Sequence, residues 1–370
     1  MSLSDSAALP SPAVGAPRIS WVQPPGGFVG LSLLNGLLRI LTLGVYHFWG
    51  KTEVRQRIWS AVRINGEPLE YRGTGGELLR GFLVVFFLIL LPMGMLSFGS
   101  SLFLSPSGHG VFSLAFWALV LMLSGIGIHR ARRYRLSRTR WRGIRGGLSG
   151  RSSRFAWTYL WTLLLVPLTL GWIVPWRAVQ LQKALVNDTR FGDKDFSFTA
   201  GAAPLYKRFW VVWLGDILLA TVAIGAISAI VMTSLPQQVS GPPRIPNIAL
   251  GKIASIAAIV FAAFLAFAMI HAWYSSRMLN YFAEHTKLQG AGFKLEATAP
   301  SLVWLVASNY LIRVLSLGFL SAVTEARSMR YLVDRLSCNG AIAFETIAQN
   351  PDALLKRGEG LAEAFNVDAF

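Results

Sequence analysis

Hydrophobic residues in this chain are concentrated in long runs, and strongly charged segments separate these runs. Four runs are long and apolar enough to cross a bilayer as helices, which takes about 20 residues. They cover residues 81–104, 110–129, 209–235 and 248–272. A short uncharged connection joins the first two runs, and a Pro-rich connection with Arg244 as its only charge joins the last two. We therefore expect two membrane-spanning helical hairpins with short outer loops.

Three further apolar segments contain residues that interrupt helices. They cover residues 28–49, 155–176 and 301–323. Each contains the sequence Leu-Thr-Leu-Gly or Leu-Ser-Leu-Gly, which ends at Gly44, Gly171 and Gly318. If the middle segment crossed the membrane, the basic segment 177–208 would lie outside, against the positive-inside rule. We therefore expect broken helices, re-entrant or interfacial, that enter and leave on the cytoplasmic side; seven full spans are the alternative.

The charged segments contain short patterns that predict β-hairpins. Aligned turn sequences end at Gly66, Gly143, Asp193, Gly290 and Gly340. Alternating apolar residues follow four of these turns, and period-two alternation beside such turns is a hairpin signal. The second turn departs from the pattern, because the sequence Arg145-Gly-Gly-Leu-Ser-Gly150 stands in place of the expected strand.

The spacing of these motifs predicts internal repeats. Each interrupting glycine lies 22 residues before the corresponding hairpin turn, as in the pair Gly44 and Gly66. Repeats of this kind build many membrane proteins. The expected fold is mainly α: a polytopic transmembrane helical protein with internal repeats and small cytoplasmic β-hairpins.

The ends of the chain differ from its middle. Residues 1–27 are rich in Ser, Pro, Ala and Gly, and they contain no apolar core of a signal peptide. This composition predicts a disordered N-terminal tail. Residues 28–370 would then form a single membrane domain, which ends in a cytoplasmic C-terminal segment at 325–370.

Composition agrees with a membrane protein and adds a strong positive charge. Hydrophobic residues make up 53% of the chain and charged residues 14%, and the mean hydropathy is +0.48. Soluble domains carry about 25% charged residues. The net charge of +17 suits cytoplasmic loops and anionic headgroups. Because the cations alternate with membrane segments, we expect anionic lipids as partners and no nucleic acid.

Four charged residues lie within apolar segments, and one of them, Lys252, is near the end of its segment and would snorkel to the interface. Arg39 and Arg313 occupy matching repeat positions, and Val166 stands at the third. A charge at the bilayer centre costs roughly 2.5–3.5 kcal/mol on insertion scales, so such residues are functional candidates. The two arginines would hold an anionic group in a cavity, or they would snorkel to the interface or pair with an acidic residue. Asp216 would be a proton or cation relay, a counter-ion to either arginine, or a structural ion pair.

A cluster of arginines follows the second span. Segment 130–154 contains no acidic residue, and alternation would place three of its arginines, at 138, 140 and 142, on one strand face. Binding of anionic lipid is one interpretation, and a topology signal on a solvated face is the other. The lipid-binding candidates are Arg130, Arg132, Arg133, Arg135, Arg138, Arg140 and Arg142.

The sequence contains no recognisable catalytic or metal-binding motif. Cys338 is the only cysteine, and no histidine pair has the spacing of a metal site. We found no nucleophile elbow and no phosphate-cradling loop. We therefore expect no enzymatic activity, no cofactor and no metal.

Two long motifs and a tail motif resemble the YjgN-like family of bacterial membrane proteins. They are Leu41-Thr-Leu-Gly-Val-Tyr-His-Phe-Trp-Gly50, the stretch from Ile64 to Leu78, and Gly358-Glu-Gly-Leu-Ala-Glu-Ala-Phe365. The resemblance implies a multi-pass protein of the bacterial inner, or cytoplasmic, membrane. It implies no function, because the family is known mainly as a domain of unknown function.

Two functions fit these features. The first is a non-enzymatic inner-membrane protein that binds or moves an anionic solute or lipid between its broken helices, with Arg39 and Arg313 at the site. The alternative is a scaffolding protein whose basic cytoplasmic repeats dock on anionic lipids or on a partner. The sequence indicates neither the ligand nor the oligomeric state.

Overall fold

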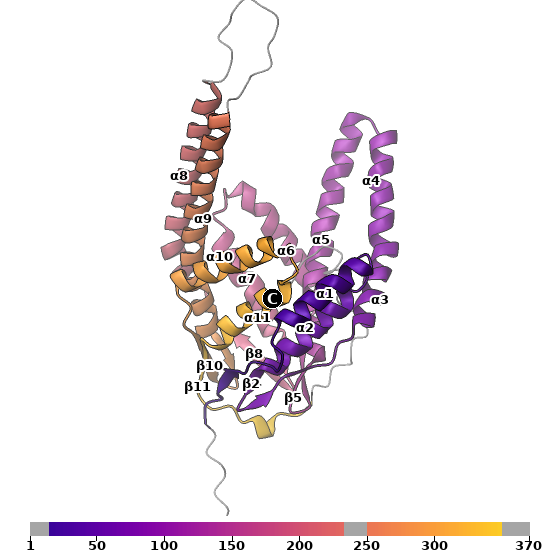
Figure 1. Cartoon of the computed structure of the whole chain (residues 1–370), viewed down its shortest axis with the longest axis vertical. Coiled ribbons are helices and arrows are strands. Elements are labelled where there is room, and N and C mark those ends of the chain that lie inside the picture. The colour runs from indigo at the N-terminus through magenta and orange to yellow at the C-terminus, as the bar shows by residue number, and fades with distance from the viewer. Residues whose placement is uncertain (1–14, 233–249, 350–370) are drawn as a thin grey trace, which may run out of the picture.

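Two long helical hairpins dominate this computed structural model, which describes residues 15–232 and 250–349. Figure 1 shows them as two columns that rise in the same direction, with short helices between their bases and strands at the opposite end. Four helices of the described residues are long and apolar enough to cross a membrane. They cover Gly75–Phe103, Pro106–Arg138, Ala203–Met232 and Gly251–Glu284.

The first hairpin contains a local widening in its rising arm. This arm consists of α3 (Gly75–Val85), a π-helical turn (Phe86–Leu90) and α4 (Leu91–Phe103), and α5 (Pro106–Arg138) returns. The π turn ends two residues before Pro92. Proline has no N–H to donate and its ring clashes with the carbonyl four residues back, so a wider turn lets the helix continue.

The second hairpin consists of α8 (Ala203–Met232) and α9 (Leu250–Glu284). Both hairpins extend further into the charged sequence than the apolar runs predicted. The second expected span stops at residue 129, whereas α5 continues to Arg138. The ends of the expected spans 209–235 and 248–272 fall partly outside the described residues.

Each of the three shorter apolar segments forms the first helix of a pair, the break after it and the start of the second helix. The pairs are α1 (Val29–Leu41) with α2 (His47–Ala61), α6 (Ser152–Leu168) with α7 (Val174–Asn187), and α10 (Ala299–Leu315) with α11 (Ser321–Val333). The first helix of each pair has 13 or 17 residues. At 1.5 Å per residue these helices are about 20–25 Å long, short of the roughly 30 Å hydrocarbon core.

The three breaks share one backbone conformation. Leu43, Leu170 and Leu317 have φ of 51°, 47° and 49°, and the glycine after each also has positive φ. In the first break, the Gly44 N–H donates to the Arg39 carbonyl at 2.7 Å, and the Leu43 N–H donates to the Ile40 carbonyl at 3.1 Å. These two bonds define a Schellman cap, which ends the helix. The same bonds recur at Gly171 and Gly318.

The β-hairpins of the charged segments join edge to edge into one antiparallel sheet of eight strands. Its order is β11-β10-β9-β8-β7-β6-β5-β4. The strands are β4 (Glu70–Tyr71), β5 (Thr139–Trp141), β6 (Ile144–Leu148), β7 (Thr189–Phe191), β8 (Lys194–Phe198), β9 (Thr286–Leu288), β10 (Ala291–Leu295) and β11 (Leu336–Asn339). Because this sheet holds strands from successive hairpins, the chain returns to the same layer after each pair of helices.

The strand β6 corrects the expectation that the second turn lacks a following strand. Gly146 and Gly147 pair with Phe191 and Arg190 of β7. A Cβ on Gly146 would lie 3.0 Å from the Leu136 carbonyl oxygen. The glycine therefore permits close packing of the strand on α5, although it removes the side-chain alternation that identifies strands in sequence.

Strand β1 (Ile19–Trp21) corrects the expected N-terminal tail of residues 1–27. It pairs with β2 (Val62–Ile64), which also pairs with β3 (Glu67–Pro68). The stretch from residue 15 is thus part of the fold, and residues 1–14 lie outside the described range. At the other end, a 3₁₀ turn (Phe344–Thr346) follows β11. The tail motif at 358–365 also lies outside the described residues.

Candidate functional site

The first and last helix pairs contact each other directly. The Ser32 hydroxyl on α1 donates to the Phe319 carbonyl oxygen at 2.6 Å, and it accepts from the Ala322 N–H at 3.2 Å. Gly36, one turn further along α1, lies against the Phe319 ring, where a Cβ would come within 2.4 Å of a ring carbon. Small residues on α1 thus let the turn before α11 approach closely, and Figure 1 shows the indigo α1 and the orange α11 in the same region.

A cavity of about 390 Å³ lies between these two helix pairs. Both predicted arginines, Arg39 and Arg313, line it. His47 and Lys51 from α2 also line it, and Glu325 from α11 is the only acidic residue in the part of the lining that the structure describes. We call this cavity, with these five residues, the cationic cleft.

Each arginine lies two residues before the end of its helix, α1 or α10. Arg39 and Arg313 are the residues whose carbonyls accept the Schellman hydrogen bond. A cation in the last helical turn also faces the negative end of the helix dipole, which stabilises it. The Arg313 Nε donates to the Thr324 hydroxyl at 2.7 Å. Arg39 is in the last turn of α1, as Arg313 is in the last turn of α10.

Two asparagines position the helices of these pairs in the same way. The Asn35 Nδ2 donates to the Gly50 carbonyl, and the Asn309 Nδ2 donates to the Thr324 carbonyl, both at 3.3 Å. Each asparagine lies four residues before the arginine of its helix. The two helix pairs therefore hold their arginines at equivalent positions relative to the asparagine hydrogen bond. The middle pair has Thr162 and Val166 at the corresponding positions, and so it contributes no charge there.

A second cavity of about 310 Å³ shares Lys51 and Glu325 with the cationic cleft. It lies between α2, α5 and α11, and three more cations line it: Arg55, Arg132 and Arg135. Two arginines predicted to bind lipid on a surface thus face the interior between helices. Trp59 and Leu332 form part of the apolar wall of this cavity.

The other arginines of the predicted lipid-binding cluster lie in different environments. Arg138 is the last residue of α5, Arg140 lies in β5, and Arg142 lies in the following turn with φ of 51°. The expected shared strand face is therefore wrong, since only one of these three residues is in a strand. Arg142 makes two hydrogen bonds with the Glu67 carboxylate, at 2.6 and 2.9 Å. Arg130 is exposed, and Arg133 is half-buried.

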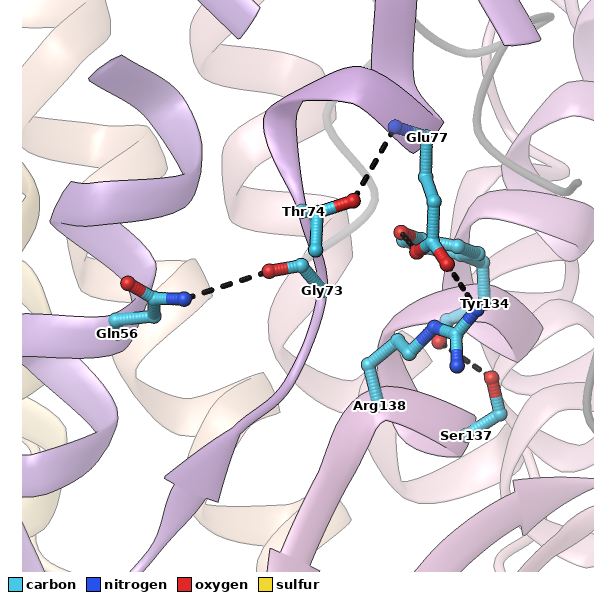
Figure 2. A network of polar contacts seen from close by, with 7 residues as sticks. All are labelled: Gln56, Gly73, Thr74, Glu77, Tyr134, Ser137 and Arg138. Atoms are coloured by element: carbon cyan, nitrogen blue, oxygen red, sulfur yellow. Dashed lines mark hydrogen bonds and ion pairs between the residues drawn. The ribbon is translucent and has the colours of Figure 1, made fainter. Parts of the chain in front are cut away.

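Arg138 belongs to a polar network that ties the start of α3 to the end of α5 (Figure 2). The Arg138 Nη2 and the Tyr134 hydroxyl donate to the two Glu77 carboxylate oxygens, at 2.6 and 2.5 Å. Tyr134 is 1% exposed. The Thr74 hydroxyl caps α3 by accepting from the Glu77 N–H at 3.3 Å. This network fixes the base of the first hairpin.

Asp216 lies apart from the cationic cleft, in the second hairpin. Its carboxylate oxygens lie 3.0 and 3.1 Å from the His271 Nε2. Asp216 is on α8 and His271 is on α9, and both side chains are about one-third exposed, at 33% and 37%. The structure thus pairs Asp216 with a histidine, and not with Arg39 or Arg313 as one expectation had it.

Two polar contacts between distant residues were not predicted from the sequence. One is the Glu77 network, and the other is His129, which is fully buried and has its Nδ1 3.0 Å from the Ser152 hydroxyl. Each joins residues that are more than 20 positions apart. The Thr74–Glu77 spacing of a capping box was the one local signal present.

Other chemistry finds little support among the described residues. In residues 15–232 and 250–349, no three His, Cys, Asp or Glu side chains are grouped as a metal site. Cys338 is buried in β11 against Leu288 and Ile342. Burial raises the pKa of the Cys338 thiol, so the fraction of reactive thiolate is reduced.

Comparison with known proteins identifies relatives but no activity. Over 149 residues the chain is 26% identical to the inner membrane protein YjgN of Salmonella typhimurium (strain LT2). The match covers 40% of this chain and 35% of that relative, so it spans about a third of the relative's length. No solved structure matches the chain.

These findings confirm the resemblance to YjgN-like proteins and the membrane location. The named relative is an inner membrane protein, and four helices of the described residues are long and apolar enough to span a membrane. The chain is an inner-membrane protein. A family of bacterial proteins of unknown function, DUF898, matches residues 24–364. Since this match covers most of the sequence, the chain belongs to the DUF898 family.

Proposed function

We propose that this protein is not an enzyme and that it binds or moves an anionic solute or lipid in the cationic cleft. The observation that carries the proposal is the convergence of Arg39 and Arg313 on one cavity together with Lys51. Guanidinium groups bind phosphate and carboxylate through paired hydrogen bonds. Away from bulk water such charge-assisted contacts are stronger than at a surface.

The internal repeat supports a shared origin for the two sides of the cleft. In this proposal, α1–α2 and α10–α11 are equivalent units that each contribute one arginine, at matching positions of matching turns. The middle pair, with Val166, supplies the frame and no ligand contact. Binding sites at the interface between structural repeats are common in transporters.

The test is anion binding by the purified full chain, with an Arg39→Gln, Arg313→Gln double variant. Inorganic phosphate is the probe, and isothermal titration gives the dissociation constant. We expect at least a tenfold weaker binding, because a hydrogen bond to a charged group contributes about 1.5–3 kcal/mol. Uptake of labelled phosphate into proteoliposomes then separates binding from transport.

The matched control removes two charges elsewhere. Arg72 and Lys294 are exposed and pair with the nearby Glu70 and Glu296. The Arg72→Gln, Lys294→Gln double variant should bind phosphate like the unmodified protein. Equal weakening in both double variants would assign the effect to net charge and refute the cleft.

The alternative is a scaffolding role, which the exposed Arg130 at the base of the first hairpin favours. In that case basic residues outside the cleft would dock on anionic lipids or on a partner. A protein that folds and binds anionic vesicles, but neither binds nor transports a soluble or lipid anion through Arg39 and Arg313, would favour this role.

A further inference from the structure

The cationic cleft continues into a second opening between two helix breaks. A cavity of about 460 Å³ lies there, lined by the last two turns of α1 and by the breaks after α1 and α10. It shares Gly36, Arg39, Gly318 and Phe319 with the cationic cleft. The remaining lining includes Ile40, Leu43 and Leu317. A path that is charged inside and apolar at its mouth therefore leads outward between the two turns.

The leucines at this mouth are exposed and strained. Leu43 is 95% exposed and Leu317 is 87% exposed, and both have the left-handed conformation. That conformation costs a residue other than glycine roughly 1–2 kcal/mol. Glycine would relieve this cost, and a polar residue would suit water better. A leucine at both positions is instead suited to contact with an apolar surrounding.

We propose that the ligand of the cationic cleft is an anionic phospholipid, which enters sideways between Leu43 and Leu317. The inference rests on the proposed function, and it names the substrate class of the same site. The headgroup phosphate contacts Arg39 and Arg313, and the acyl chains remain outside, against Ile40 and the two leucines. An amphiphile of this kind matches both the charged interior and the apolar mouth.

A free phosphate offers the arginines the same chemistry as a lipid headgroup. The apolar lining of the mouth is the feature that favours a lipid over a soluble phosphate. A soluble anion gains nothing from an apolar rim and must lose water to pass it. A phospholipid already resides where the rim leucines would lie, and its acyl chains contact them without leaving the bilayer. Uncharged polar substitutions at the rim should therefore weaken lipid binding and leave phosphate binding unchanged.

The experiment uses the full chain in phosphatidylcholine vesicles with a small fraction of spin-labelled phosphatidylglycerol. The motionally restricted component of the spectrum measures the lipid held by the protein. We expect phosphatidylglycerol to be selected over labelled phosphatidylcholine, and the selectivity to fall at least threefold in Arg39→Gln, Arg313→Gln. It should fall similarly in Leu43→Asp, Leu317→Asp, where aspartate tolerates the backbone and its charge repels the headgroup.

The middle turn provides a matched control. Leu170 has the same conformation and is 76% exposed, but its helix carries Val166 in place of arginine. Leu170→Asp should leave the selectivity unchanged. An equal loss in Leu170→Asp would show that any charge at a turn lowers lipid binding, and would overturn the entry path.

Phosphate titration of the same variants distinguishes the remaining outcomes. In one outcome, the arginine variant loses phosphate binding, but the protein shows no lipid selectivity or the rim substitutions do not change it. The ligand is then a soluble anion, and only this inference fails. If the arginine variant changes neither measurement, the proposed function fails as well. Should the aspartate variant not fold, Leu43→Asn, Leu317→Asn replaces it, and unchanged lipid selectivity there overturns the inference.

Discussion

The Ser32 hydroxyl donates a hydrogen bond to the Phe319 carbonyl oxygen, across a sequence separation of 287 residues. The same hydroxyl accepts from the Ala322 N–H, so one side chain satisfies two backbone groups of another helix pair. Ser32 is only 2% exposed. This contact is one of those that hold the first and last helix pairs together at the cationic cleft, beside the cluster of Phe28, Val54, Ile58, Ala322 and Ala326.

Replacing Ser32 with alanine should destabilise the protein. Ser32→Ala leaves the Phe319 carbonyl and the Ala322 N–H without this partner, and an unsatisfied buried group costs about 1–3 kcal/mol. Thermal unfolding in detergent, followed by tryptophan fluorescence, should show a lower Tm. The control is Ser60→Ala, because the exposed Ser60 hydroxyl bonds only the Arg57 carbonyl of its own helix. Equal Tm values for the two variants would contradict the contact.

The close approach at Gly36 leads to a second prediction. Gly36→Ala places a methyl group within 2.4 Å of the Phe319 ring, and overpacking of this kind costs about 1–3 kcal/mol. Gly30 lies on the same helix with no atom within 4 Å of its Cβ position. Gly30→Ala should be neutral or stabilising by up to about 1 kcal/mol, because alanine favours helix. If both changes had the same sign in thermal unfolding, the packing of α1 would differ from that described.

The base of the first hairpin depends on Glu77. Glu77→Ala removes the acceptor of both Arg138 and Tyr134, and the Arg138 side chain is only 12% exposed. Loss of the carboxylate should cost about 1–3 kcal/mol. Glu70→Ala breaks an exposed ion pair with Arg72 and should cost at most about 1 kcal/mol. A Tm for Glu77→Ala no lower than that for Glu70→Ala would rule out a stabilising network.

Single-cysteine labelling can test the membrane topology. The Gln349 Nε2 donates to the Gly143 carbonyl at 3.0 Å, and the neighbouring Ala348 N–H donates to Asp193 at 2.9 Å. Two adjacent residues cannot lie on opposite sides of a bilayer. In a Cys338→Ser background, Gly143→Cys and Asp193→Cys should therefore be equally protected from an impermeant thiol reagent in intact cells. Ser107→Cys should be labelled, and labelling of position 193 would require a full span between residues 155 and 176.

The native Cys338 should react slowly with alkylating reagents. Burial raises its pKa, so at a given pH less thiolate forms than at an exposed cysteine. Its rate should keep rising with pH beyond the point at which an ordinary thiol, with a pKa near 8.5, levels off. Asn339→Cys in the Cys338→Ser background is the exposed control. We expect at least tenfold slower modification of Cys338 at pH 8, and similar rates would contradict its burial.

Local signals in the sequence predicted local structure well. The helix breaks were predicted from Gly44, Gly171 and Gly318, because a left-handed turn has a strong preference for glycine. Matching spacing also suggested that Arg39 and Arg313 have equivalent positions, and both line one cavity. The conformation of each break is set within about six residues, which a pattern can reveal.

Contacts between distant elements were not predictable in this way. The partner of Arg138 is Glu77, 61 residues away, and no pattern links the two. Arg132 and Arg135 belong to an apparent surface cluster, but the packing of α5 against α2 and α11 places them inside a cavity. Strand β6 was missed because its glycines lack the side chains by which alternation is recognised. These features depend on tertiary packing, which outweighs local preference.

The hydrogen bond between Ser32 and Phe319 can form only late in the synthesis of the chain. Helix α1 leaves the ribosome early, and its partner turn follows 287 residues later. At about 5–20 residues per second, the delay is on the order of 15 to 60 seconds. During that time Arg39 and the apolar face of α1 must wait beside the translocon or in the bilayer without their final neighbours. The cleft can therefore form only after Glu325, the last of its lining residues, has been synthesised, and no shorter nascent chain contains it.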